Sequence, residues 1–222
     1  YCRIFLARRC QNVSQFLTVS NFSRAEMKTL LHIPNEKTRV IYEGFDAPTF
    51  YPRSSKEVGV FLCARCLPEK YFLFVGTGDP RKNMNIIPEA LDRAGIDVPL
   101  VVAGWSGWAG KNVRENVLFL GYVEDDALAC LYSGAMALIF PSRYEGFGLP
   151  ILEAMACGCP VVTTREASMP EVAGDAALYM KDPDDAEGLA AMLKELSASP
   201  VIRRQWAEKG LAQARRFSWR NT

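Results

Sequence analysis

The sequence predicts an α/β domain in which helices cover both faces of a parallel sheet. Six short apolar runs alternate with helical patterns from Tyr71 onward, and glycine-containing loops follow the first, third and fourth of these runs. Apolar residues make up 49% of the 222-residue chain, as in proteins with a buried core. Alternating strands and helices give parallel sheets, which bind ligands beyond the carboxyl ends of their strands.

Composition and charge exclude several classes of protein. The net charge is +1, so nothing indicates general nucleic-acid binding. No run approaches the ~20 apolar residues of a membrane helix, and no signal peptide is visible. The seven cysteines are odd in number and lie mostly among apolar residues, which favours free thiols in a reducing compartment. Cys63 and Cys66 form a lone C-x-x-C, for which metal or redox use is the less favoured interpretation.

The first residues give the weakest signals. The chain begins at Tyr1 rather than Met, so we expect it to be part of a longer protein. Residues 1–16 show little periodicity and are interpreted as helical or irregular. The apolar run that starts at Phe16 predicts a short strand, after which Ser20 or Ser23 can cap a helix that ends at Leu31.

Two further segments precede the main alternation. Residues 38–42 predict a strand followed by a glycine-containing turn. Residues 46–70 contain three prolines and are interpreted as a linker and surface segment. The single histidine, His32, lies at a helix end, where a surface role is favoured over catalysis.

The first strong strand is followed by a glycine loop and a basic pair. Residues 71–75 are apolar, and a loop over 76–83 leads into a helix through Leu91. Arg81 and Lys82 lie in this loop, and an Arg side chain can bind a diphosphate in a bidentate manner. Two adjacent basic residues are equally typical of an ordinary solvated surface.

The remaining elements follow from shorter apolar runs, from helix-capping residues and from prolines. Acidic residues after Lys181 suit the start of a helix, where the macrodipole favours them. We expect strands at 98–103, 117–120, 135–140, 160–163 and 177–180, and helices at 126–133, from about 150 to 157, near Pro170, after Asp182 and over 201–217.

The stretch from Phe140 to Pro160 contains several candidate ligand-binding residues close together in sequence. A buried strand ends at a polar loop with two glycines, and Pro150 then suits the first turn of a helix. Backbone N–H groups exposed at such a helix start favour phosphate oxygens. Glu145 and Glu153 frame the loop. Glu153 can accept hydrogen bonds from a ribose, or it can be an acidic residue that the helix dipole favours.

The pair Glu145 and Glu153 resembles the E-x7-E signature of retaining GT-B glycosyltransferases of the large nucleotide-sugar-dependent family 4. Residues from about Val19 to Met180 are covered by motifs in the order of that family. Beside the glutamate pair, the motifs that match are Phe119-Leu-Gly-Tyr-Val123, Phe140-Pro-Ser, Ala156-x-Gly-x-Pro-Val and Ser168-Met-Pro-Glu-Val-Ala-Gly174.

The resemblance implies the C-terminal, donor-binding half of a GT-B fold, with a Rossmann-like parallel sheet and helices on both faces. Residues 1–45 would be a remnant of the N-terminal, acceptor-side domain, and residues 46–200 the nucleotide-sugar-binding domain. Residues 201–222 would form a C-terminal helix that packs back toward the N-terminal domain; contact of its arginines with a membrane surface is the alternative.

The resemblance also implies residue roles. Glu145, Lys82 and Arg81 would be catalytic, and no metal is expected. Many members have Arg directly after the loop glycine, where this chain has Thr77, so Arg81 would take that role from another position. Donor binding is expected at Gly76, Tyr122, Val123, Gly146, Phe147, Gly148, Leu149 and Glu153.

The implied function is transfer of a sugar, with retention of configuration, from a GDP- or UDP-linked donor to a sugar, polysaccharide or lipid-linked acceptor. Mannosyl transfer from GDP-mannose in polysaccharide or glycolipid synthesis is the favoured form. The expected location is the cytoplasm, including the inner face of the membrane. Because much of the acceptor side is expected outside this chain, it should bind donor but transfer poorly.

Two alternatives remain from other classes of function. One is a nucleotide-sugar isomerase or hydrolase on the same fold, and the other is a non-catalytic nucleotide-sugar-binding module. An NAD-dependent enzyme is less favoured, because the sequence has no G-x-G-x-x-G followed by an acidic residue about 20 positions later.

Overall fold

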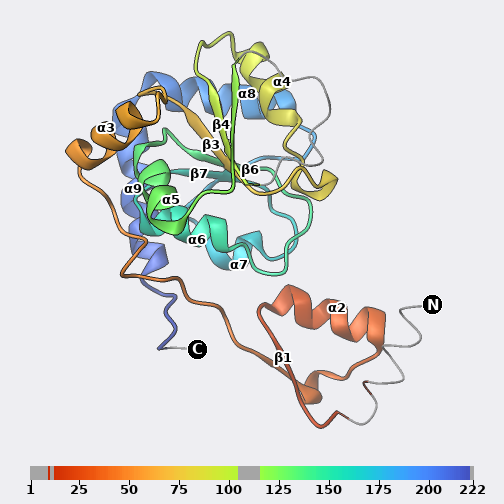
Figure 1. Cartoon of the computed structure of the whole chain (residues 1–222). Coiled ribbons are helices and arrows are strands. Elements are labelled where there is room, and N and C mark those ends of the chain that lie inside the picture. Colours follow the sequence, from red (N-terminus) through yellow and green to blue (C-terminus); the bar gives the residue numbers. More distant parts are fainter. Residues whose placement is uncertain (1–9, 11–12, 105–115, 221–222) are drawn as a thin grey trace.

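The structure is a computed structural model that describes residue 10, residues 13–104 and residues 116–220 (Figure 1). Strands β3 to β8 form one parallel sheet in the order β5-β4-β3-β6-β7-β8, and β1 pairs with β2 in a separate parallel sheet. The strands are β1 (Phe16–Thr18), β2 (Thr38–Val40), β3 (Phe72–Val75), β4 (Leu100–Ala103), β5 (Val117–Gly121), β6 (Leu138–Phe140), β7 (Val161–Thr163) and β8 (Leu178–Tyr179).

The helices alternate with these strands as expected. Short 3-10 turns lie at Asn35–Lys37 and Pro80–Lys82. The α-helices are α2 (Asn21–Leu31), α3 (Ser55–Ala64), α4 (Ile86–Ala94), α5 (Asp125–Gly134), α6 (Leu149–Ala156), α7 (Met169–Ala173), α8 (Ala186–Ala198) and α9 (Pro200–Ala214).

The large sheet is buried on both faces, which explains why its strands are continuous apolar runs rather than alternating ones. Leu73 and Val101 pack on one face with the apolar sides of α5, α6 and α9. Phe72 and Val102, their neighbours in sequence, pack on the other face with α4 and α8. Figure 1 shows this three-layer arrangement.

The order of the strands creates a switch point between β3 and β6. The chain runs from β3 outward to β4 and β5, and then returns to place β6 on the opposite side of β3. In open parallel sheets the crevice for ligands lies beyond the carboxyl ends of the two strands that flank such a point. The loops after β3 and β6 therefore mark the place where a site is expected.

The small sheet and α2 contact the main domain through α7, beside which α2 lies in Figure 1. Ser20 caps α2, because its Oγ accepts a hydrogen bond from the Ser23 amide at 2.9 Å. The carboxylate of Glu171 in α7 accepts hydrogen bonds from the amides of Asn21 and Phe22 at 2.8 and 2.7 Å. An acidic group at this position is also favoured by the helix dipole.

One expectation is wrong. Residues 46–70 are not only linker and surface, because α3 forms within them. Ser54 and Glu57 make a capping box, and Val58 and Leu62 are buried. Three prolines obscured this short helix, although a Ser followed three residues later by Glu is a recognisable helix start.

Other expectations fall partly or wholly outside the described residues. Most of the segment 1–16 belongs to this group. Pro200 separates α8 from α9 as the first residue of the latter.

None of the helices in the described ranges is both long enough and apolar enough to cross a membrane.

Candidate active site

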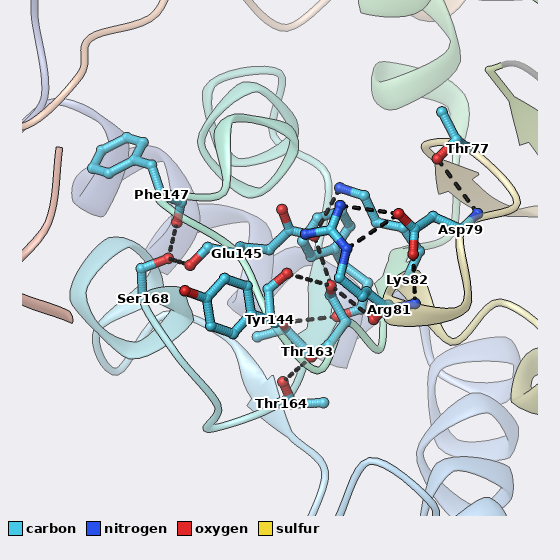
Figure 2. Close-up of polar contacts among 12 residues, drawn as sticks. Thr77, Asp79, Arg81, Lys82, Tyr144, Glu145, Phe147, Thr163, Thr164 and Ser168 are labelled. Carbon is cyan, nitrogen blue, oxygen red and sulfur yellow. Dashed lines mark hydrogen bonds and ion pairs between the residues drawn. The ribbon is translucent and has the colours of Figure 1, made fainter. Parts of the chain in front are cut away.

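An ion pair joins the two loops that flank the switch point. Lys82 Nζ lies 2.7 Å from Glu145 Oε1, and the two side chains are only 16% and 14% exposed. The ammonium group also lies 5.0 Å from the centre of the Phe140 ring. Figure 2 shows Lys82 reaching from the loop after β3 toward the glutamate in the loop after β6. Sequence analysis did not predict a contact between these two residues, which the order of the strands brings together.

A buried serine completes the surroundings of Glu145. Ser142 Oγ donates a hydrogen bond to the same Oε1 atom at 2.6 Å, and Ser142 is 0% exposed. Oε2 of Glu145 makes no hydrogen bond or ion pair with any residue in the described ranges. One carboxylate oxygen is therefore anchored by Lys82 and Ser142, whereas the other has no such partner in the described ranges.

Hydroxyl groups from neighbouring elements hold the backbone of the loop after β6. Ser168 Oγ lies within donating distance of two carbonyl oxygens, that of Glu145 at 2.9 Å and that of Phe147 at 2.8 Å (Figure 2). Thr164 Oγ1 donates to the Ser142 carbonyl at 2.7 Å. Because Ser168 and Thr164 are 0% exposed, these bonds are shielded from water and fix the loop more firmly than surface bonds would.

Gly146 joins the loop to the start of α2. Its carbonyl oxygen accepts hydrogen bonds from Ser20 Oγ at 2.7 Å and from Ser23 Oγ at 3.2 Å. In the ranges that the structure covers, the N–H groups of the loop and helix start donate no hydrogen bond; these are the N–H groups of Gly146, Phe147, Gly148 and Leu149. They lie at the start of α6, where the helix dipole favours an anion.

The loop after β3 depends on a close approach of two backbones. Gly76 has φ +152° and Gly104, at the end of β4, has φ +132°. A Cβ atom on Gly104 would lie 2.1 Å from the carbonyl oxygen of Gly76. Glycine at 104 therefore allows the strand end to pack directly beneath the loop that carries Lys82.

Arg81 is placed differently from Lys82. Its Nε and Nη2 atoms donate to Asp79 Oδ2 at 3.1 and 3.0 Å, and its side chain is 55% exposed. Hydrogen bonds from Arg81 lower the pKa of the Asp79 carboxyl. The backbones of the two loops also meet here, since the Arg143 amide donates to the Arg81 carbonyl at 2.8 Å. Arg81 thus lies at the rim, whereas Lys82 points inward.

Glu153 lies in α6 and is partly buried. Tyr132 in α5 donates a hydrogen bond from its hydroxyl to Glu153 Oε2 at 3.0 Å. The pKa of the Glu153 carboxyl is raised to about 7, mainly by burial; the hydrogen bond from Tyr132 lowers it, and the charge of Asp125 raises it. A carboxylate in this environment is costly to hold, so a simple preference for the helix dipole does not account for it.

Tyr122 and Val123 follow β5 at the same edge of the sheet. Tyr122 is 79% exposed, and no contact within the described part of the chain joins its ring to the ion pair. Val123 is partly buried against the core. The structure therefore brings together Lys82 and Glu145 directly, but leaves the expected nucleobase edge apart from them.

Sequence reasoning missed several polar residues of the site. Ser142, Ser168 and Tyr132 had no assigned role, although all three are fully buried. A polar residue directly after an apolar strand, as at Ser142, is a usable signal, because a buried hydroxyl needs a partner. The direction of the Tyr132 hydroxyl had no such signal, since its acceptor lies 21 positions away in another helix.

Comparison with known sequences agrees with this geometry. A family model described as glycosyl transferases group 1 matches residues 66–213. O-antigen chain mannosyltransferase B of Escherichia coli is 37% identical over 228 residues, covering 92% of this chain and 57% of that protein. O-antigen chain mannosyltransferase RfbU of Salmonella typhimurium is 29% identical, covering 90% of this chain and 56% of that protein. The chain thus spans little more than half the length of these two relatives.

Solved structures share the fold at lower identity. Sucrose-phosphate synthase from Thermosynechococcus elongatus superposes with a TM-score of 0.81 at 24% identity, covering 98% of this chain and 57% of that one. The Anabaena protein HepE, in complex with UDP-glucose, gives 0.85 at 20% identity, covering 97% and 63%. The chain therefore belongs to the glycosyl transferases group 1 family, and its six-stranded sheet is a Rossmann-like domain of the GT-B fold.

Proposed function

We propose that this chain is the donor-binding part of a retaining glycosyltransferase that moves mannose from GDP-mannose to a sugar, polysaccharide or lipid-linked acceptor. The observation that carries the proposal is the Lys82–Glu145 pair at the switch point of the sheet, beside backbone N–H groups with no partner in the described ranges. The choice of mannose is supported by relatives that are named mannosyltransferases.

The chemical difficulty in such a transfer is the charge of the departing nucleoside diphosphate. In this proposal Lys82 and Arg81 supply positive charge to the diphosphate, and the N–H groups that precede α6 add hydrogen bonds. Preorganised donors of this kind stabilise charge as it develops in the transition state. No metal is needed in this scheme, since two cations and a helix N-terminus neutralise the leaving group.

The two glutamates would hold opposite ends of the donor. Glu145 has one oxygen anchored by Lys82 and Ser142, and its other oxygen would face the hydroxyls of the sugar ring. Glu153 would accept hydrogen bonds from the ribose, and Tyr122 and Val123 would border the base. Glu153 belongs to α6 and Glu145 to the loop that leads into it, so their spacing depends on the helix and on how that loop is held.

The acceptor and the location are also part of the proposal. The acceptor would be a growing polysaccharide or a glycolipid, in keeping with the O-antigen enzymes among the relatives. Cytoplasmic location, including the inner membrane face, is favoured by the free thiols of the described cysteines.

The test is calorimetric titration of the chain with GDP, UDP and ADP and with their sugar conjugates, followed by thermal unfolding. A ligand at ~100 times its dissociation constant adds about 2.7 kcal/mol to the free energy of unfolding. We expect GDP and GDP-mannose to bind, and Lys82→Ala and Glu153→Ala to lose that binding while remaining folded. Absence of binding by every nucleotide, in a folded sample, would contradict the proposal.

Product analysis separates the proposed transfer from other chemistry. With GDP-mannose and an acceptor extract, a protein that also carries the acceptor side should form a mannosylated product, and this chain alone should form little. Release of free mannose without any acceptor would indicate a hydrolase instead. Binding without turnover in the longer protein would indicate a non-catalytic module.

A further inference from the structure

A buried phenol lies behind one of the two glutamates of the candidate site. Tyr132 is 0% exposed, and its hydroxyl donates to Glu153 Oε2 at 3.0 Å. Its ring packs edge to face on Phe50, with the ring centres 6.2 Å apart. Burial and the charge of Glu153 raise the pKa of Tyr132 well above its usual value, so the hydroxyl keeps its proton and acts as a donor.

The hydrogen bond from Tyr132 determines which oxygen of the Glu153 carboxyl group remains available to another partner. Glu153 Oε2 is held from α5, while Oε1 makes no hydrogen bond or ion pair with any described residue. A hydrogen bond to the charged form favours ionisation, and so this contact opposes the effect of burial on the carboxyl. Tyr132 therefore both orients Glu153 and favours the form that accepts hydrogen bonds on both oxygens.

The other titratable groups near Glu153 do not favour the ionised form of its carboxyl group. Asp125, also in α5, raises the pKa of Glu153. Cys157, which follows α6, has its own pKa raised to about 12 by burial and is a neutral thiol at pH 7. No lysine or arginine of the described ranges forms an ion pair with Glu153. Within that part of the chain, the phenol is the group that favours the carboxylate.

We propose that Tyr132 is a positioning residue for ribose recognition, because its hydroxyl holds one oxygen of the Glu153 carboxyl group and so orients that group toward the donor. The inference rests on the proposed function, in which Glu153 binds the ribose. It goes further by assigning a specificity role to a residue that does not itself touch the ligand.

The test compares GDP with 2′,3′-dideoxy-GDP, which lacks both ribose hydroxyls. The phosphate groups of both ligands titrate between pH 5 and 7 as well. The dissociation constant of 2′,3′-dideoxy-GDP divided by that of GDP, measured at each pH, therefore isolates the contribution of the ribose hydroxyls to binding. We expect Tyr132→Phe to lower this ratio about tenfold at pH 7.5, the loss that corresponds to one hydrogen bond to a charged group. The pH midpoint of the ratio should move upward, because the carboxyl loses the contact that lowers its pKa.

Tyr71→Phe is the matched control. Tyr71 is also 0% exposed, and its hydroxyl donates to the Leu131 carbonyl at 2.7 Å, so its loss removes a comparable buried hydrogen bond. This variant should keep both the ratio and the midpoint of the wild-type chain. The carboxyl-carbon NMR signal of Glu153 gives its pKa directly without ligand, and we expect an upward shift in Tyr132→Phe only.

The outcomes are distinguishable. An unchanged ratio and midpoint in Tyr132→Phe, while Glu153→Gln loses ribose discrimination, would overturn the role of Tyr132 and leave the proposed function intact. If Glu153→Gln kept the discrimination, the ribose role of Glu153 and this inference would both fail. In that case, loss of GDP binding in Lys82→Ala would still support the diphosphate part of the proposed function.

Discussion

Lys82 and Glu145 form an ion pair across the switch point of the sheet, with 2.7 Å between Nζ and Oε1. Each residue comes from a different loop, so the pair joins the segments after β3 and β6. A diphosphate that enters the site would compete with Glu145 for the ammonium group. In the proposed function, the pair holds the cation in place in the absence of ligand and would present it to the diphosphate.

The first prediction concerns the stability of this pair. Removing one partner leaves the other charge nearly buried without compensation, which is more costly than removing both. We expect Lys82→Met to lower the free energy of unfolding by about 2–3 kcal/mol, whereas the double variant Lys82→Met/Glu145→Gln should lose about 1 kcal/mol. Urea unfolding at pH 7.5 measures both. With Glu145→Gln measured alone as well, additive effects in this double-mutant cycle would show that the two side chains do not interact in solution.

The second prediction concerns the attachment of α2. The Glu171 carboxylate caps two amides of that helix, at Asn21 and Phe22. We expect Glu171→Ala to weaken local protection there by about 1 kcal/mol, as for loss of a helix cap, so that amide exchange becomes roughly fivefold faster. Hydrogen exchange detected by mass spectrometry or NMR measures this.

The matched control is Glu166→Gln. Glu166 is an exposed glutamate in the loop before α7, and its substitution removes the same charge from the same region. It should leave exchange at α2 unchanged. Equal acceleration in both variants would mean that a general charge effect, and not the cap, protects these amides.

The third prediction concerns the close approach beneath the loop after β3. Alanine at Gly104 would place Cβ 2.1 Å from the Gly76 carbonyl oxygen. Because that oxygen belongs to the backbone, it cannot move aside as the end of a flexible side chain could. We expect Gly104→Ala to lower the free energy of unfolding by about 3 kcal/mol or more, since both strain and overpacking act. It should also weaken GDP binding, because Gly76 must shift.

Gly95→Ala separates backbone strain from the clash. Gly95 has φ +61° and nothing lies within 4 Å of the added Cβ, so only the strain of the left-handed conformation remains. Thermal unfolding should show a loss of about 1 kcal/mol for this variant. Similar losses in both variants would indicate that the two strand ends are further apart than the structure shows.

The sequence predicted the main sheet well because its strands are short apolar runs separated by glycine loops. It placed β3 and the helix start at Leu149 within about one residue and the end of β6 at Phe140, although the predicted strand began three residues before β6 does; these elements determine where the site lies. Helix α3 was missed because prolines near it outweighed a capping signal. Local patterns are reliable where they agree with one another, and ambiguous where they compete.

The site was predictable in its residue types but not in its contacts. Lys82 and Glu145 are separated by 63 positions, so their pairing depends on the order of β3 and β6 in the sheet, which local periodicity does not encode. The same holds for Tyr132 and Glu153, which meet only because α5 packs on α6. Arg81 and Lys82 looked alike in sequence, and only the fold shows that one is at the rim and the other points inward.

The last prediction follows from the pKa of Glu153, which is about 7 in the folded chain against an ordinary value of 4.5. Between these two pH values the folded protein keeps a proton that the unfolded chain has released, so the free energy of unfolding falls as pH rises through this window. The full difference corresponds to roughly 3 kcal/mol. Glu153→Gln mimics the protonated form and retains an acceptor for Tyr132. It should therefore be more stable than the wild-type chain at pH 8, by up to roughly 3 kcal/mol, and nearly equal to it at pH 5.

Urea unfolding at both pH values measures the effect, and Glu195→Gln serves as the control because Glu195 is exposed on α8. The control should give the same small change at pH 5 and pH 8. A stability gain in Glu153→Gln that did not depend on pH would contradict the raised pKa. A gain at pH 8 together with lost GDP binding would show that this carboxylate is kept at the expense of stability, as expected of a residue retained for a ligand.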